Sequence, residues 1–237
     1  MVSNRTMWMI GGTILSIWAV GTFYLNASPN GAPDPAQAQR STQKAEYPVK
    51  ELMKPGPLPE IAIGAKDAPI TVVEYSSLTC PHCASFHSDS LPKLKEKYID
   101  TGKVRYIIRE FPLDNLAAAA FMLARCAGPE KNLPMIELLY AKQKDWAFVK
   151  DSPLPPLRKL LKINAGIDED AFNKCLSDQK TLDKVLEIRK RGDKVFGVSS
   201  TPTFFVNGKV LKGGHSLEEF EKIMADDLKK IEESKKK

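Results

Sequence analysis

The sequence predicts an α/β domain with a helical insertion, preceded by an N-terminal membrane anchor or signal peptide and a linker. Three observations support this fold class. An apolar strand pattern over residues 70–75 leads into a helix that opens with Cys80-Pro81-His82-Cys83. Helical patterns alone then fill residues 113–196, and a strong hairpin signal, Asn207-Gly208, follows them. A chain of 237 residues that is 43% hydrophobic can bury one substantial core besides its appendages.

The N-terminal stretch, residues 7–25, has no charged side chain and is preceded by Arg5. Its length is close to the ~20 residues that a membrane-spanning helix needs. A cleaved signal peptide is the alternative, but cleavage after Ala27 would place Leu25 where a small residue is preferred. We therefore favour an anchor that leaves the bulk of the protein in the periplasm, at the outer face of the cytoplasmic membrane.

Residues 26–58 are rich in Pro, Ala, Gln and Ser and show neither helical nor strand periodicity, which predicts a flexible linker. The folded domain is expected over residues 59–232, and a basic tail over 233–237. Much of the net charge of +6 lies near this end. We expect a solvated helix end and no nucleic-acid binding, because aromatic residues are not interleaved with the basic ones.

The first half of the domain predicts two strands, one helix and a third strand. Residues 61–63 fit a short edge strand, and residues 70–75 fit a buried one. From Pro81 a helix is expected to about Thr101, with a kink at Pro92. Residues 104–109 alternate in the manner of a strand.

The second half begins with the helical insertion, where Asp114, Asp168 and Thr181 are expected to cap helices. After it, Asn207-Gly208 predicts the turn of a hairpin whose first strand opens at Pro202. Ser216 and Glu219, three residues apart, predict the capping box of a last helix.

The Cys80-Pro81-His82-Cys83 motif predicts a redox pair. Cys80 falls at a helix N-terminus, where free N–H groups and the helix dipole stabilise an anion. Pro81 suits the first helical position, and His82 can add a positive charge beside the Cys80 sulfur. The pKa of Cys80 should lie well below the usual ~8.5, so that the Cys80–Cys83 disulfide is an oxidant. Half of a zinc site and a purely structural disulfide are the alternatives; a zinc site would need a second ligand pair, which the sequence lacks.

Two polar residues near this motif have open interpretations. Glu74 lies in the apolar strand, six residues before Cys80. It is either a solvated side chain at a sheet edge or a partly buried proton acceptor for the redox pair. His87 lies two turns beyond Cys80, and we interpret it as a surface histidine.

The remaining two of the four cysteines, Cys126 and Cys175, both lie in the insertion beside apolar residues. In an oxidising compartment we expect them to form a structural disulfide. Closing a loop of about 50 residues would stabilise the fold by up to about 4 kcal/mol. Two buried free thiols are the alternative.

Cys-Pro-His-Cys after a strand, a helical insertion, and Thr201-Pro202 before a hairpin together resemble the DsbA-like branch of the thioredoxin superfamily. The likeness covers about residues 58–232 and implies a thioredoxin fold with a helical insertion. It implies that Cys80 is the exposed, attacked sulfur and Cys83 the buried one, with Glu74 at the position of the family's buried acid. It also implies a cis bond at Thr201–Pro202, lining a groove where substrate peptide pairs as an added strand.

The resemblance and the motif together predict a thiol:disulfide oxidoreductase that gives its Cys80–Cys83 disulfide to unfolded or reduced exported proteins. No cofactor beyond this disulfide and no metal are expected, and a quinone-linked membrane oxidase is the implied reoxidant. The alternatives are a disulfide isomerase or reductase, and a non-catalytic thiol-binding chaperone or metal-delivery module. We expect a monomer, because the N-terminal linker is too short and too polar to form a dimerisation domain.

Overall fold

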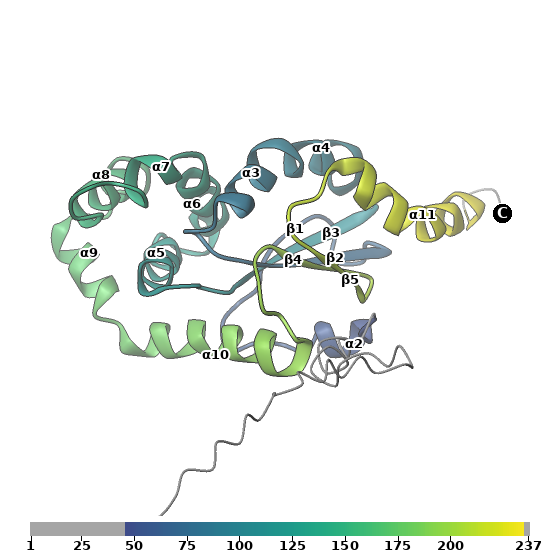
Figure 1. Cartoon of the computed structure of the whole chain (residues 1–237), viewed down its shortest axis with the longest axis horizontal. Helices are drawn as coiled ribbons and strands as arrows, with labels where there is room; N and C mark the ends of the chain where they lie inside the picture. Colours follow the sequence, from purple (N-terminus) through teal and green to yellow (C-terminus); the bar gives the residue numbers. More distant parts are fainter. Residues whose placement is uncertain (1–45, 235–237) are drawn as a thin grey trace, which may run out of the picture. The chain divides into compact units, whose positions relative to one another are not determined.

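The computed structural model describes residues 46–234, and its centre is a five-stranded sheet in the order β1-β3-β2-β4-β5 (Figure 1). Strands β2 and β3 pair in parallel, and every other neighbouring pair is antiparallel. The strands are β1 (Ile61–Ile63), β2 (Ile70–Ser76), β3 (Val104–Glu110), β4 (Thr203–Val206) and β5 (Lys209–Lys212). The predicted edge strand is confirmed, because β1 pairs with β3 alone.

Helices cover both faces of this sheet (Figure 1). Helices α3 (Pro81–Asp89), α4 (Leu91–Leu94) and α11 (Leu217–Ser234) lie on one face, and α2 (Val49–Leu52) and α10 (Gln179–Phe196) on the other. Side chains alternate between the two faces along β2. Val72 therefore belongs to the core under α3, whereas Tyr75 packs with Phe196 of α10.

The insertion between β3 and β4 is wholly helical, as predicted. Its helices are α5 (Asn115–Cys126), α6 (Pro129–Ala141), α7 (Gln143–Trp146), α8 (Leu154–Ala165), α9 (Glu169–Leu176) and α10. Asp114 and Asp168 accept hydrogen bonds at the starts of α5 and α9, which confirms both caps. Thr181 was wrong as a cap: Asp178 caps α10 by accepting from the Thr181 N–H.

The helix that starts at Pro81 is broken sooner than expected. Helix α3 ends at Asp89, and α4 and a π-helical turn (Lys95–Ile99) continue the segment. The break precedes Pro92, because a proline cannot donate the hydrogen bond that its position in a continuous helix requires. Gly102, with φ +72°, then turns the chain into β3.

Residues 46–58, which we assigned to the linker, pack against the domain instead. Glu46 forms a β-bridge with Lys209, and the Tyr47 ring meets Phe205 at a centroid distance of 5.5 Å. Leu52 is 2% exposed, in the core beside α10. The packed segment therefore includes the thirteen residues 46–58 before the boundary expected at residue 59, because tertiary contacts hold a segment that has no periodicity of its own.

The C-terminal part follows its local signals. Asn207 (φ 46°) and Gly208 (φ 91°) make the tight turn between β4 and β5, with positive φ at both positions as a type I′ turn requires. The Ser216 N–H donates to Glu219 Oε2 (2.9 Å) at the start of α11. This helix reaches Ser234, slightly beyond the boundary expected at residue 232.

The predicted anchor, residues 7–25, lies outside the described residues. Within residues 46–234, the structure contains no helix whose length and hydrophobicity would let it cross a membrane.

Candidate active site

The Cys80-Pro81-His82-Cys83 motif forms the start of α3, immediately after the loop that leaves β2. Cys80 is the N-cap residue, with extended backbone angles, and Pro81 occupies the first turn. The buried Gln143 side chain holds this loop by donating to the carbonyls of Leu78 (2.8 Å) and Cys80 (3.0 Å). Sequence reasoning missed Gln143, because no local pattern connects it with a loop more than 60 residues away.

The two thiols are free and differ in exposure. Cys80 is 6% exposed and Cys83 is fully buried. The Cys80 sulfur lies 3.3 Å from the carbonyl oxygen of Thr201 and can donate to it in the thiol form. The peptide bond between Thr201 and Pro202 is cis. The fold therefore brings Thr201-Pro202 against Cys80 from 121 residues along the chain.

The pKa of Cys80 is lowered to about 5, chiefly by a hydrogen bond from the Cys83 thiol. Burial acts in the opposite direction, and hydrogen bonds from the Thr201 side chain and the backbone N–H groups of Cys83 and His82 lower it further. The two backbone N–H groups reach the sulfur because Cys80 caps the helix, where N–H groups lack intrahelical partners. At neutral pH the thiolate therefore outnumbers the thiol by about 100 to 1.

The pKa of Cys83 is raised well above its usual value. Burial is the largest cause, followed by the hydrogen bond to Cys80 and the negative charge of Glu74. The reduced pair thus holds one thiolate, on the outer sulfur, and one proton, on the inner sulfur.

Glu74 is fully buried in β2, so the interpretation as a solvated edge residue is wrong. Its Oε2 atom accepts from Tyr106 (2.5 Å) and lies 2.9 Å from His87 Nε2. The surface assignment of His87 is also wrong, since its side chain is 2% exposed. The signal that could have placed His87 is its spacing of four residues from Cys83, which puts both side chains on one helix face.

His82, in contrast, is an exposed residue. Its contribution to the lowered pKa of Cys80 comes from the backbone N–H. A further effect of the imidazole charge stays a prediction.

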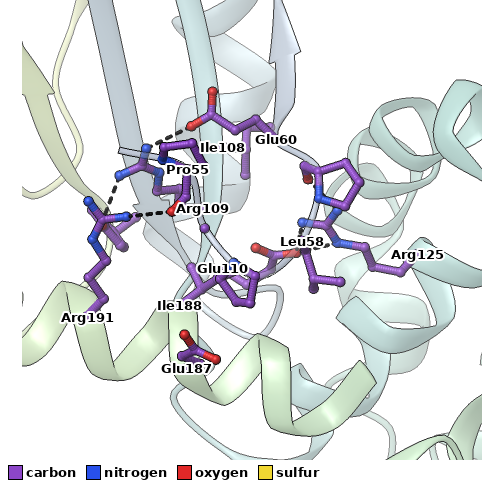
Figure 2. Close-up of a pocket in the computed structure, with 14 residues that line it drawn as sticks. Pro55, Leu58, Glu60, Ile108, Arg109, Glu110, Arg125, Glu187, Ile188 and Arg191 are labelled. Atoms are coloured by element: carbon purple, nitrogen blue, oxygen red, sulfur yellow. Dashed lines mark hydrogen bonds and ion pairs between the residues drawn. The ribbon is translucent and has the colours of Figure 1, made fainter. Parts of the chain in front are cut away.

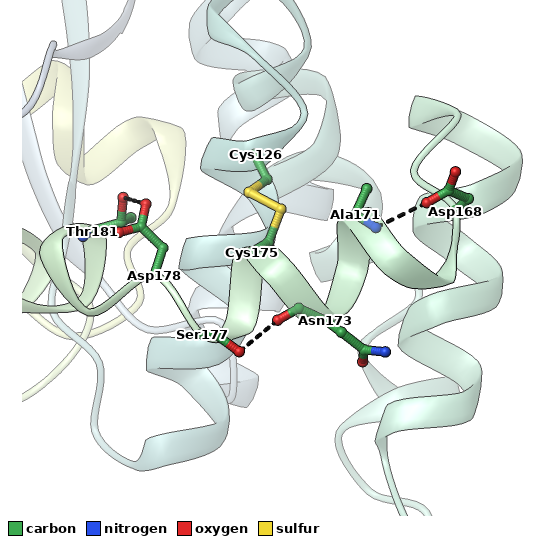
Figure 3. The surroundings of a disulfide bond; sticks show 8 residues. All are labelled: Cys126, Asp168, Ala171, Asn173, Cys175, Ser177, Asp178 and Thr181. Atoms are coloured by element: carbon green, nitrogen blue, oxygen red, sulfur yellow. Dashed lines mark hydrogen bonds between the residues drawn. A yellow bond between two sulfur atoms is a disulfide. The ribbon is translucent and has the colours of Figure 1, made fainter.

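The sulfurs of Cys126 and Cys175 are joined in a disulfide (S–S 2.01 Å), which links the end of α5 to α9 (Figure 3). The capping contact of Asp168 with the Ala171 N–H and the bond from Ser177 to the Asn173 carbonyl order the helix that carries Cys175. The second pair of cysteines is thus placed in the insertion, on other elements than the redox motif.

A cavity of about 260 Å³ lies away from the motif, between the segment around Pro55–Glu60 and α10 (Figure 2). Two ion pairs lie in its wall: Arg109 pairs with Glu60 (2.8 Å), and Arg125 pairs with Glu110. Tyr75 lines this cavity and lies on the face of β2 opposite to Glu74. The cavity therefore has no lining residue in common with the Cys80 site. Among the described residues, no group of three or more His, Cys, Asp or Glu side chains is placed to hold a metal ion.

A family model described as Thioredoxin matches residues 58–226. The chain belongs to the thioredoxin family. A protein of Rickettsia bellii, provisionally named protein-disulfide oxidoreductase, is 36% identical over 203 residues, covering 86% of this chain and 76% of that relative. Disulfide bond formation protein D of Bacillus subtilis is 29% identical over 171 residues, covering 70% of this chain and 76% of that protein.

Among solved structures, α-DsbA1 of Wolbachia pipientis matches with a TM-score of 0.67 and 34% identity, over 74% of this chain and 94% of that one. The predicted DsbA-like thioredoxin fold with a helical insertion is thereby confirmed. The chain is a DsbA-like protein-disulfide oxidoreductase, whose reaction is dithiol–disulfide exchange.

Proposed function

We propose that Cys80–Cys83 is the redox-active pair of this thioredoxin-family protein and that it donates its disulfide to reduced proteins. One observation supports this direction of transfer: the pKa of the Cys80 thiol is lowered, whereas that of the Cys83 thiol is raised. A sulfur with a pKa of about 5 is a stable thiolate and a good leaving group. Stabilising the reduced form makes the disulfide the stronger oxidant, which favours an oxidase over an isomerase or reductase.

In the proposed reaction, a substrate thiolate attacks the Cys80 sulfur of the Cys80–Cys83 disulfide. The new bond joins substrate and Cys80, and the electron pair of the broken bond leaves on Cys83. The Cys83 sulfur takes up a proton as it leaves, because burial raises the pKa of this thiol well above its usual value, and Glu74 is the proposed carrier of that proton. A second substrate thiolate then attacks the substrate sulfur of the mixed disulfide, and Cys80 leaves as a thiolate.

The Thr201 and Pro202 backbone is proposed as one wall of the substrate groove. The Thr201 carbonyl lies 3.3 Å from the Cys80 sulfur, so an extended peptide beside this segment would bring its own cysteine to Cys80. Unfolded or reduced exported proteins are the proposed substrates, in the periplasm or at the outer face of the membrane. A quinone-linked membrane oxidase is the proposed reoxidant.

Oxidative refolding of a reduced, unfolded protein tests the proposal. Catalytic amounts of the wild-type protein should accelerate disulfide formation, and Cys80→Ala should abolish the effect. Cys83→Ala is the matched variant: it retains Cys80 but cannot form the Cys80–Cys83 disulfide, so it should also fail to accelerate refolding. Refolding no faster with the wild type than with Cys80→Ala would refute the proposed activity.

Thiol trapping in intact cells then separates an oxidase from an isomerase. An oxidase keeps Cys80 and Cys83 mainly oxidised, whereas an isomerase or reductase keeps them mainly reduced. A mainly reduced pair would therefore overturn the proposed direction of transfer, even where purified protein exchanges disulfides.

A further inference from the structure

His87 contacts Glu74 in the interior of the site and also lines a pocket between the α3–α4 segment and α6. It follows Cys83 by four residues, one helical turn further along the same face. Its Nε2 atom lies 2.9 Å from Glu74 Oε2, and its side chain is almost completely buried. The ring lies against Tyr140 of α6, with centroids 4.2 Å apart.

The Nδ1 atom of His87 is buried and has no hydrogen-bond partner among the described residues. An imidazole can accept a proton at one nitrogen while it releases one from the other. One nitrogen of the buried His87 ring contacts a carboxylate, and the other has no hydrogen-bond partner. This arrangement would allow the ring to carry a proton.

A pocket of about 420 Å³ adjoins this ring. Its buried lining residues are His87, Leu91 and Tyr140, and the exposed residues Ser88, Lys95 and Glu137 also line it. Neither Thr201 nor Cys80 borders it, so a peptide bound at Cys80 would leave it open to solvent.

We propose that His87 carries protons between Glu74 and the solvent of this pocket whenever the Cys80–Cys83 disulfide is formed or broken. The proposal rests on the proposed function and extends it to a further residue. When substrate breaks the disulfide, Cys83 takes a proton from Glu74, and Glu74 is reprotonated through His87. When the disulfide is restored, the Cys83 proton leaves to Glu74 and then, through His87, to water.

The other groups around His87 are compatible with this route. Tyr106 and Tyr140 keep their protons, because burial raises the pKa of each hydroxyl well above its usual value. Lys95 and Glu137 belong to the solvent-exposed part of the pocket. Within the described residues, the route from Glu74 to the pocket thus passes through the one side chain that touches both, His87.

Reaction of the reduced protein with oxidised glutathione separates the steps. The Cys80 thiolate first attacks the glutathione disulfide, which gives a Cys80–glutathione mixed disulfide and a glutathione thiolate. This step needs no proton from Cys83. Cys83 must then lose its proton before its sulfur attacks Cys80 and expels the second glutathione thiolate. Rapid acid quenching and mass spectrometry follow both steps in one experiment.

In His87→Gln the amide can still donate a hydrogen bond to Glu74 but cannot carry a proton. His87→Phe keeps the ring contacts and loses both nitrogens. In each variant we expect the first step to keep its wild-type rate and the closing step to slow by about 100- to 10,000-fold, the range of general acid–base assistance. The mixed disulfide should accumulate, and the closing rate should rise more steeply with pH than in the wild type.

Ser85→Ala, an exposed position on α3, is the matched control and should close at the wild-type rate. Closing within two-fold of wild type, with an unchanged pH profile, in either folded His87 variant would overturn the proposal and leave His87 a structural residue. Failure of the wild-type protein to form the Cys80–glutathione disulfide would instead refute the proposed function.

Discussion

At the scale of single residues, the chemistry depends on the different surroundings of two thiols three positions apart. Cys80 meets hydrogen-bond donors at a helix N-terminus, and Cys83 meets burial and the charge of Glu74. The thiol hydrogen bond between them contributes to both shifts: it lowers the pKa of Cys80 and raises that of Cys83. This hydrogen bond therefore increases the difference between the pKa values of the two thiols.

Thr201→Val tests the donors around Cys80. Loss of the hydroxyl should raise the Cys80 pKa by about 1 unit, because a hydrogen bond to a charged group contributes roughly 1.5 kcal/mol or more. Titration of the thiolate ultraviolet absorbance measures the shift. Thr71→Val, at the other end of β2, is the control and should leave the titration unchanged. An unaltered pKa in Thr201→Val would show that its hydroxyl does not stabilise the thiolate.

At the scale of elements, α10 approaches the sheet at a glycine. A Cβ added at Gly192 would lie 2.7 Å from a Tyr75 ring carbon, and Tyr75 is itself held among the rings of Phe111, Phe196 and Phe205. Gly192→Ala should therefore lower the free energy of unfolding by about 1–2 kcal/mol, although alanine is the better helix former. Urea denaturation measures this.

Lys190→Ala, at an exposed position of the same helix, is the control for Gly192→Ala and should change stability by less than about 0.5 kcal/mol. A Gly192→Ala protein at least as stable as the wild type would show that the Tyr75 ring can move away from the added Cβ atom at little energetic cost. The close approach would then be a consequence of helix docking and not a requirement for it.

The Cys126–Cys175 disulfide acts between α5 and α9, across a sequence separation of 49 residues. Replacing both cysteines with serine should lower the free energy of unfolding by about 2–4 kcal/mol, since the cross-link restricts the unfolded chain. Chemical denaturation of the oxidised proteins measures the loss. The titration of Cys80 serves as the control and should not move, because neither of these residues is among the causes of its pKa.

At the scale of the whole molecule, the redox state and stability are linked through Cys80. Its pKa is about 5 in the folded reduced protein and close to 9 when unfolded, so the unfolded state binds more protons between these values. The stability of the reduced form should therefore rise with pH from about 5 to about 8.5. The oxidised form lacks this ionisation, and its stability should not show the same increase.

Denaturation of both forms at several pH values tests this linkage. The stability of the reduced form relative to the oxidised form should grow by up to about 1.4 kcal/mol per pH unit within that window. Above about 9 the gain should end, because Cys80 is then ionised in both states, and the raised pKa of Cys83 should make stability fall with a further rise in pH. A difference that does not vary with pH would contradict the lowered pKa of Cys80.

The local signals in the sequence were sufficient for most elements of the fold. The Cys80-to-Cys83 motif, the Asp114 and Asp168 caps and the Asn207-Gly208 turn each depend on a few adjacent residues, and the structure places each element accordingly. A capping side chain or a positive-φ turn determines its conformation within about one helical turn, so it can be identified without knowing the rest of the fold. The resemblance to a known family then supplied the order of the elements.

Tertiary structure alone decided what surrounds the two sulfurs. Gln143 holds the loop before α3, and Tyr106 and His87 contact the buried carboxylate of Glu74. These contacts join elements far apart in the chain, and the packing of helices on the sheet determines which face meets which. Sequence periodicity reports that a side chain is buried, but the partner that it meets there, and hence its chemistry, depends on the fold.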